Sequence, residues 1–301
     1  MRLSNSILFL VPALIWGSTW YVIKFQIGDT DALFSVGYRF ILAGAILVLY
    51  SLLKGLPMRF PVKNHLFIAL QGACLFGFNY WLIYMSEAQL TSGLVAVIFV
   101  WLIFMNVILS AVFLKSPVRV NVVFGGLVGV VGIGLLFKDE LRMFDFSDRN
   151  FVAFLLALGS TTLASCGNIL SAYNQKQKMP VIQTNAYGML YGAVFVLAVA
   201  IFTGGKPGFN LHFSYLISLL YLSVFGSVIA FTAYLNLLGK IGPDRAGYIS
   251  LVTPVIALLI STIFENYQWT ATGFFGLMLI LIGILLALQP KTWARTARSL
   301  N

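Results

Sequence analysis

Charged residues are scarce in this chain. Only 9 % of its 301 residues are Asp, Glu, Lys or Arg, whereas 60 % are hydrophobic. So little polar surface cannot cover a water-soluble globule, and the apolar runs reach the roughly 20 residues that a helix needs to cross a bilayer. The alternation of polar and apolar residues that marks barrel strands is absent. The composition therefore predicts an all-α integral membrane protein that lies in the lipid bilayer.

Residues that often bind metals or carry catalysis are also few. The two cysteines, Cys74 and Cys166, fall inside apolar runs, and the two histidines, His65 and His212, fall in predicted connections. These positions favour neither a disulfide framework nor a metal-ligand cluster nor a catalytic dyad. A phosphate-binding loop is missing as well, so ATP is not implied. We expect no enzyme activity, no metal and no other cofactor.

Acidic residues are the scarcer charge, nine against 19 Lys and Arg, and the formal net charge is +10. In a soluble protein this excess would suggest nucleic acid, but here the basic residues lie in short connections between apolar runs. With the N-terminus in the cytoplasm, thirteen of them lie on the cytoplasmic side, five on the other side and Arg39 within a span. This bias follows the positive-inside rule. It predicts a multi-pass inner-membrane protein with both termini cytoplasmic and no nucleic-acid partner.

Ten apolar runs are long enough to be transmembrane helices. Their approximate bounds are 6–24, 33–53, 66–86, 91–113, 119–137, 151–173, 182–203, 213–238, 246–264 and 269–288. Most connections have only a few residues, so each helix must run back beside the one before it.

The second half of the chain repeats the pattern of the first. Adding 151 to the numbers of Gly125 and Gly132 gives Gly276 and Gly283, in the fifth and tenth spans. Because five spans is an odd number, the second copy must enter the membrane from the opposite side. We therefore predict two inverted five-helix repeats, residues 1–145 and 146–301, an arrangement common among secondary transporters. The glycine spacing favours close packing of span five on span ten, or of two copies in a homodimer.

Several short motifs recur in a recognisable order. They are Leu14-Ile-Trp-Gly-Ser-Thr-Trp20, Tyr38-Arg39-Phe40, Leu90-Thr-Ser-Gly-Leu-Val-Ala96, and Thr253-Pro254 followed by Glu265, Gly276 and Gly283. Together they resemble the ten-helix EamA-type branch of the drug/metabolite transporter superfamily. The resemblance implies two EamA-type repeats that export amino acids or other small metabolites. It also implies a cavity lined mainly by helices one, three, four, six, eight and nine.

The first copy departs from that pattern. It has Ile103 and Leu114-Lys115 where such proteins often carry a proline and a glutamate, and only the second copy keeps Pro254 and Glu265. We therefore expect span four to be a more regular helix than span nine.

Asparagines in the middle of apolar runs are candidates for substrate binding, because an unpaired polar group is costly inside the membrane. Asn79, Asn106, Asn168 and Asn236 meet this condition. The alternative is a hydrogen bond between neighbouring helices. We favour Asn79 and Asn168, because the resemblance places their helices around the cavity.

Aromatic residues form a second set of candidates. They are Trp16, Tyr80, Phe99, Trp101, Tyr234 and Tyr248. Such residues either pack between helices or form a stacking wall, which would suit an amino-acid side chain or a quaternary ammonium group.

Four residues are candidates for coupling or gating. Arg39 lies about 9 Å inside span two, at about 1.5 Å per residue, so its side chain could snorkel to the surface as an anchor. The resemblance favours this anchor role, because similar proteins often carry a basic residue here without binding through it. A charge within the membrane is also a functional hypothesis by default. Glu87 and Glu265 lie at predicted helix ends, where a solvated carboxylate is the alternative to proton coupling. Pro254 marks a candidate hinge in span nine.

These patterns predict a transporter of a small-molecule substrate by alternating access, and amino acids or related compounds as its exported cargo. A proton gradient and facilitated diffusion both remain open as the driving force, and so do the monomer and the homodimer. The alternatives are uptake or exchange of a choline-like amine, and a polytopic enzyme acting on lipid-linked substrates. The enzyme would need acids or histidines that converge on one face, which this sequence does not show.

Overall fold

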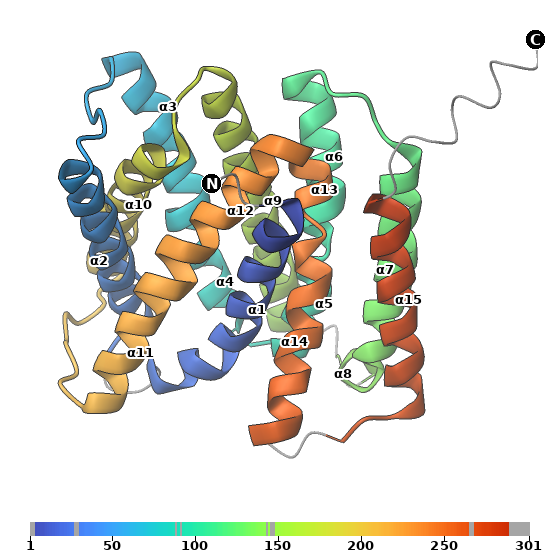
Figure 1. The fold of residues 1–301 in the computed structure, drawn as a ribbon. Coiled ribbons are helices and arrows are strands. Elements are labelled where there is room, and N and C mark those ends of the chain that lie inside the picture. The colour runs from blue at the N-terminus through green and yellow to red at the C-terminus, as the bar shows by residue number, and fades with distance from the viewer. Residues whose placement is uncertain are drawn as a thin grey trace, which may run out of the picture.

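The chain folds into a bundle of helices that run up and down side by side (Figure 1). A computed structural model describes residues 4–26, 30–87, 89–90, 92–142, 144, 148–264 and 268–288. Within these residues nine helical segments are long and apolar enough to cross a membrane, and Val120–Leu136 is a shorter apolar helix of 17 residues. The predicted all-α bundle with ten spans is confirmed.

The first five spans are built from α1 (Asn5–Ile23) with the short η1 (Lys24–Gln26), α2 (Ala32–Leu53), α3 (Val62–Gly72) with η2 (Ala73–Phe78) and α4 (Asn79–Glu87), α5 (Ser92–Phe99) with α6 (Trp101–Leu114), and α7 (Val120–Leu136). The last five are built from α9 (Asp148–Lys176), α10 (Val181–Phe202), α11 (Phe213–Ser223) with η3 (Val224–Ile229) and α12 (Ala230–Ile241), α13 (Pro243–Ala246) with α14 (Ile249–Phe264), and α15 (Ala271–Leu288). The short α8 (Lys138–Arg142) lies between the halves.

Local sequence signals set several helix ends. The Ser4 hydroxyl accepts a hydrogen bond from the backbone N–H of Ile7 at 3.3 Å, and the Asp31 carboxylate accepts one from Leu33 at 2.8 Å. Both are N-caps that satisfy backbone donors without an intrahelical partner. After α10 the chain turns at Gly204, whose φ of +79° is strained for residues with a side chain.

Helix contacts follow the inverted repeat. The second span, α2, packs along α10, the second span of the other half, and α7 packs along α15 in the same way. Helix α1 contacts α12 and α14, while its counterpart α9 contacts α4 and α6. Each half therefore packs mainly against the other, and buried side chains such as Phe40, Phe76 and Met189 fill the space between α2, η2 and α10.

Glycines allow α7 and α15 to touch through their backbones. A Cβ atom added at Gly125 would lie 2.5 Å from the Gly283 carbonyl oxygen, and one added at Gly132 would lie 2.7 Å from that of Gly276. The two helices stand side by side at the edge of the bundle (Figure 1). The repeated glycines thus serve the predicted packing of span five on span ten.

Spans three and eight each contain one turn of π-helix. The two turns, η2 (Ala73–Phe78) and η3 (Val224–Ile229), lie 151 residues apart, the offset of the sequence repeat. In η3 the Ser227 hydroxyl donates to the carbonyl oxygen of Leu222 at 3.0 Å. Because π-turns widen a helix locally and occur often at functional sites, their matched positions mark these two spans as special in both halves.

Span four is broken, contrary to the expectation of a regular helix. Helix α5 ends at Phe99 and α6 begins at Trp101, with Val100 in a turn between them. The N–H of Ile103 bonds to the carbonyl of Val100 at 3.1 Å, a bond over three residues instead of four. A proline is therefore not required for the break. Pro254 itself lies within the continuous helix α14.

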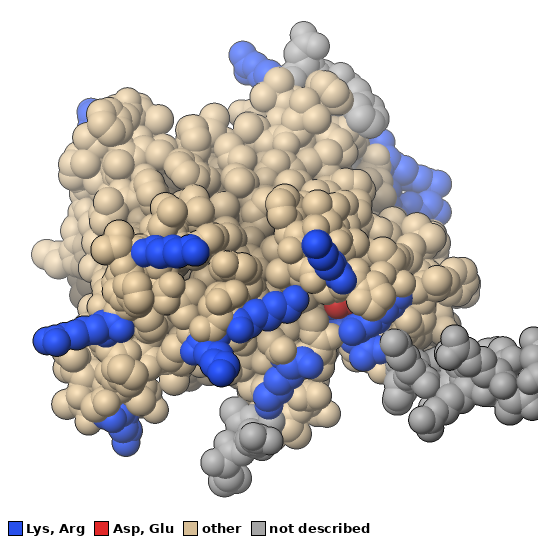
Figure 2. Space-filling view, turned by 90° about the horizontal axis from the view of Figure 1, so that it is seen from above, with Lys and Arg blue, Asp and Glu red and all other residues tan. Residues whose placement is uncertain are grey.

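Basic side chains collect at one end of the bundle. At this basic end α2, α6, α9 and α12 finish and α3, α7, α10 and α13 begin, and it is the face shown in Figure 2. The Lys and Arg residues of this end that the structure describes are Lys54, Arg59, Lys63, Lys115, Arg119, Lys176, Lys178, Lys240 and Arg245. The opposite end has five among the described residues, which are Lys24, Lys138, Arg142, Arg149 and Lys206.

Candidate substrate cavity

A cavity lies between the two halves of the bundle, near the middle of the helices. It offers about 190 Å³ to the centre of a water molecule, room for on the order of ten waters or one small organic solute. Side chains reach it from α1, α2, α4, α5, α6, α9, α12, α13–α14 and η2. The spans that contribute are those that the resemblance implied, with span two in addition.

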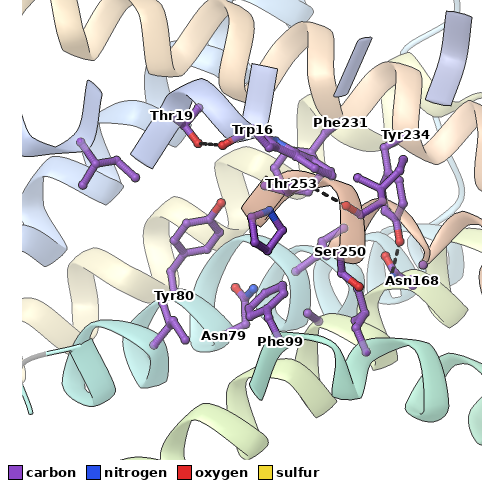
Figure 3. A pocket seen from close by; sticks show the side chains of 18 of the residues that line it. Trp16, Thr19, Asn79, Tyr80, Phe99, Asn168, Phe231, Tyr234, Ser250 and Thr253 are labelled. Carbon is purple, nitrogen blue, oxygen red and sulfur yellow. Dashed lines mark hydrogen bonds between the residues drawn. The ribbon is translucent and has the colours of Figure 1, made fainter. Parts of the chain in front are cut away.

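Six aromatic side chains form much of the cavity wall: Tyr84 and the five labelled in Figure 3, which are Trp16, Tyr80, Phe99, Phe231 and Tyr234. The Trp16 ring packs edge-on against Phe231 and Tyr234, with centroids 4.9 and 5.2 Å apart. Its Nε1–H donates to the carbonyl of Gly226 in η3 at 3.0 Å. This bond orients the Trp16 ring, so the wall is held in place before any solute enters.

Two asparagines bring polar atoms to this largely apolar space. The Nδ2 of Asn168 donates to the Tyr234 hydroxyl at 2.9 Å and to Asn106 Oδ1 at 3.3 Å. The Oδ1 atoms of Asn168 and Asn79 are buried and accept no hydrogen bond, and the hydroxyl of Ser250 also lacks a partner. Buried acceptors without a donor are unfavourable, so they call for donors on a bound solute or water.

Asn106, by contrast, joins helices. Its Nδ2 donates to the carbonyl of Pro243 at 2.9 Å, and its Oδ1 accepts from Ser165 at 2.6 Å. The residue is fully buried between α6, α9 and α13. The alternative of an interhelical hydrogen bond therefore applies to Asn106. Asn236 also makes a structural hydrogen bond, but within one helix: its Nδ2 donates to the backbone carbonyl of Thr232 at 2.7 Å.

The cavity is closed toward the basic end. Asn168 and Ile249, on that side, are only 1 % and 2 % exposed, whereas Ile23 and Tyr84, toward the opposite end, are partly exposed. Closer to the basic end than the hydrogen bonds of Asn106, Arg119 forms an ion pair with Asp244 at 3.2 Å. It also donates to the carbonyl of Ile241 at 3.3 Å. These contacts join the first half to the second and close the described part of the bundle between the cavity and the basic end.

Two predicted binding residues lie elsewhere. Trp101 is 40 % exposed and packs beside Phe104, with centroids 6.1 Å apart, on the outside of the bundle. A new helix begins at Trp101, after the turn at Val100. Of the two predicted residues Phe99 and Trp101, only Phe99 therefore faces the cavity. Tyr248 is fully buried, and its hydroxyl donates to the carbonyl of Val122. We therefore remove Trp101 and Tyr248 from the proposed binding residues.

Of the four candidates for coupling or gating, two line the cavity. Arg39 and Pro254 line the cavity, and Arg39 is 5 % exposed and does not snorkel to the surface. Glu87 ends α4, but its side chain lies outside the described residues, as does all of Glu265.

Some cavity residues are missing from the predicted set, although the repeat pointed to them. Subtracting 151 from Phe231 and Ser250 gives Tyr80 and Phe99, which were predicted. Applying the offset to every candidate would have found both. The hydroxyl residues Thr19 and Thr253 carry no such signal, because the offset pairs them with Leu170 and Leu102, which were not candidates. Their hydroxyls bond to carbonyls of their own helices.

Known proteins resemble the chain over nearly its whole length. The inner membrane transporter YedA of Escherichia coli K12 is 28 % identical over 281 residues, covering 90 % of this chain and 88 % of its own. PagO of Salmonella typhimurium is 24 % identical over 99 % of this chain and 97 % of its own. The transporter YvbV of Bacillus subtilis is 25 % identical over 99 % and 95 %.

A solved crystal structure aligns over 100 % of both chains with a TM-score of 0.81 and 18 % sequence identity, which supports the fold. The model of the EamA-like transporter family matches residues 3–138 and again residues 151–289. With one such match in each half, the chain belongs to the EamA-like transporter family and is a multi-pass membrane transporter.

Proposed function

We propose that the protein exports amino acids or closely related small metabolites across the cytoplasmic membrane. The observation that carries this proposal is the pairing of an aromatic wall with the unpartnered Oδ1 atoms of Asn79 and Asn168. The wall suits an apolar side chain, and the two acceptors suit an ammonium group, which has three donors. Most specific ligand sites combine apolar walls with a few placed polar groups in this manner.

We propose alternating access as the transport mechanism. The halves are inverted, so exchanging their conformations would close the open end of the cavity and open the basic end. The contacts that must break are those of Asn106 with Pro243 and of Arg119 with Asp244. Exchange between the two states then carries the solute without a continuous pore.

The basic end is proposed to face the cytoplasm, because positively charged connections are retained on that side. The cavity then opens to the outside, the state in which an exporter releases its cargo. A single cysteine at Lys206→Cys, in a chain without Cys74 and Cys166, should react with an impermeant maleimide in intact cells. Lys178→Cys should react only after permeabilisation; the reverse pattern would contradict this orientation.

Uptake or exchange of a choline-like amine is the second candidate. The aromatic rings of Trp16 and Tyr80 favour it, because a quaternary ammonium group is attracted to ring faces. It differs from the first candidate in needing no carboxylate on the solute.

Counterflow in proteoliposomes tests both candidates. Labelled leucine, phenylalanine and choline should be compared with and without a pH gradient, and we expect the amino acids to exchange. Asn79→Ala and Phe99→Ala should slow exchange about 10-fold or more, since each removes a cavity contact. Asn236→Ala and Trp101→Ala, which change an asparagine and an aromatic residue outside this cavity, should leave the exchange rate unchanged. Movement of choline alone would favour the second candidate, and no movement of any compound would count against both.

A further inference from the structure

Arg39 is a positive charge buried inside the membrane region. It lies seven residues after the start of α2, about 10 Å along the helix, and its side chain faces the cavity at 5 % exposure. A charged side chain at such a depth is costly unless it is paired, and it commonly marks a substrate or ion pathway. The contacts of Arg39 therefore decide which role it has.

The guanidinium group is only partly satisfied by the protein. Its Nε donates to the Ser227 hydroxyl in η3 at 2.8 Å. Its Cζ lies 5.3 and 5.7 Å from the ring centroids of Phe40 and Tyr80. Among the described residues, no carboxylate lies within ion-pair distance of Arg39 and no acceptor is hydrogen-bonded to its Nη atoms. Four of its five N–H donors are thus left for another partner.

The surroundings hold this group in place. A Cβ atom added at Gly226 would lie 3.1 Å from Nη2, so the absence of a side chain there leaves room for the guanidinium. Ser227 fixes Nε from the same π-turn, and the Tyr80 ring borders both Arg39 and the cavity. The side chain is therefore oriented by one hydrogen bond and by packing, while its fork of Nη donors stays unpaired.

We propose that Arg39 binds the carboxylate of the transported solute through its two Nη groups. A planar guanidinium matches the two oxygens of a carboxylate and forms paired hydrogen bonds with them. The substrate class is then small zwitterions and monocarboxylates, and amines without an acid group are excluded. This inference rests on the proposed function, since it assigns the acid group of the same solute.

The two ends of the solute have complementary partners in the cavity. Arg39 offers donors on the α2 side, while the Oδ1 atoms of Asn79 and Asn168 offer acceptors on α4 and α9. In the described part of the cavity lining, no acidic side chain competes for the ammonium group. An amino acid can satisfy both sets at once, a monocarboxylate only the Arg39 set, and an amine only the acceptors.

Two series of matched compounds separate these cases. One series is phenylalanine, 3-phenylpropanoate and 2-phenylethylamine, and the other is leucine, 4-methylpentanoate and 3-methylbutylamine. Their affinities for the purified wild-type protein are measured by ligand-induced thermal stabilisation, and their movement by counterflow. We expect both carboxylate compounds of at least one series to bind about 10-fold or more tightly than the amine, because paired hydrogen bonds between a guanidinium and a carboxylate are stronger than those between neutral groups.

The variants Arg39→Gln and Arg39→Lys test the residue itself. Arg39→Gln should weaken binding of both carboxylate compounds about 10- to 100-fold and leave the amine unaffected, whereas Arg39→Lys, which keeps the charge but loses the fork, should be intermediate. If Arg39→Gln does not fold, the wild-type comparison decides alone.

Two results overturn the proposal: an amine that binds wild type as tightly as its zwitterion, or Arg39→Gln with unchanged affinity for the carboxylates. Movement of amines without carboxylates would keep a transport function and reject the role of Arg39. If no compound binds or moves, the proposed function fails and this inference fails with it.

Discussion

Asn168 and Asn106 have the same side chain but different surroundings. Asn168 uses its two donors on Tyr234 and Asn106 and keeps its Oδ1 free, whereas Asn106 uses both ends of its amide. An acceptor without a partner, on a residue that lines the cavity, is a candidate for a donor of the solute, whereas a satisfied amide between helices is not. Hydrogen-bond partners therefore support the proposed binding role of Asn168 and indicate a structural role for Asn106.

Asn106→Ala should destabilise the protein. It removes the acceptor of Ser165 and Asn168 and the donor to Pro243, and leaves buried polar groups unpaired. We expect a loss of about 1–3 kcal/mol, seen as a lower Tm in detergent. Asn236→Ala is the control, because its amide bonds only within its own helix, and it should change stability by less than about 0.5 kcal/mol. Equal Tm values for the two variants would contradict the structural role of Asn106.

At the scale of elements, the π-turns and the helix breaks shape the cavity. The η2 turn precedes Asn79 and Tyr80 directly, and the η3 turn supplies the Gly226 carbonyl and the Ser227 hydroxyl. An extra residue in a helical turn rotates everything that follows by about 100°. The two turns thus determine which faces of spans three and eight point into the cavity.

Close packing of α7 on α15 predicts opposite effects for two neighbouring glycines. Gly132→Ala would place a Cβ 2.7 Å from the Gly276 carbonyl oxygen, so the helices must separate, at about 1–3 kcal/mol of stability. At Gly134 the nearest atom would be 3.9 Å away, on Leu141, so Gly134→Ala should be neutral or stabilising by up to about 1 kcal/mol. Thermal unfolding of the two variants checks this difference. A lower Tm for Gly134→Ala than for Gly132→Ala would rule out the backbone contact.

At the scale of the whole molecule, closure is asymmetric. The basic end is held by Asn106 and by the Arg119–Asp244 pair, while the partly exposed lining residues Ile23 and Tyr84 lie toward the opposite end. The pair is partly exposed, at 28 % for Arg119 and 12 % for Asp244, so its contribution should be near 1 kcal/mol. That is enough to shift a two-state equilibrium without destroying either state.

Asp244→Asn should therefore expose the cavity to the basic side more often. A cysteine at Ser250→Cys, in a chain lacking Cys74 and Cys166, reports this when maleimide is added to inside-out vesicles. We expect labelling about five times faster in Asp244→Asn, because about 1 kcal/mol changes the population by that factor. The charge swap Arg119→Asp with Asp244→Arg should restore the slow rate. Unchanged labelling in Asp244→Asn would show that the ion pair does not hold the gate.

Much of this architecture follows from local sequence properties. The length of the apolar runs predicts the ten spans, and the 151-residue offset predicts the inverted halves, because both depend on hydrophobicity and order along the chain. Six of the eight predicted binding residues line the cavity, among them Asn79 and Asn168, since a polar or aromatic residue in mid-span is informative wherever it lies.

The tertiary structure decided the rest. The turn at Val100 places Phe99 inside and Trp101 outside, and the break depends on how α5 and α6 pack, not on a proline. From the sequence, the Arg39 side chain could reach the membrane surface. In the structure its orientation is set by the hydrogen bond to Ser227, which is 188 residues away in the chain. The composition and the internal repeat of the sequence are enough to predict a ten-span transporter. Which side chains meet in its cavity depends on contacts between distant segments, and these contacts exist only once the two halves have packed together.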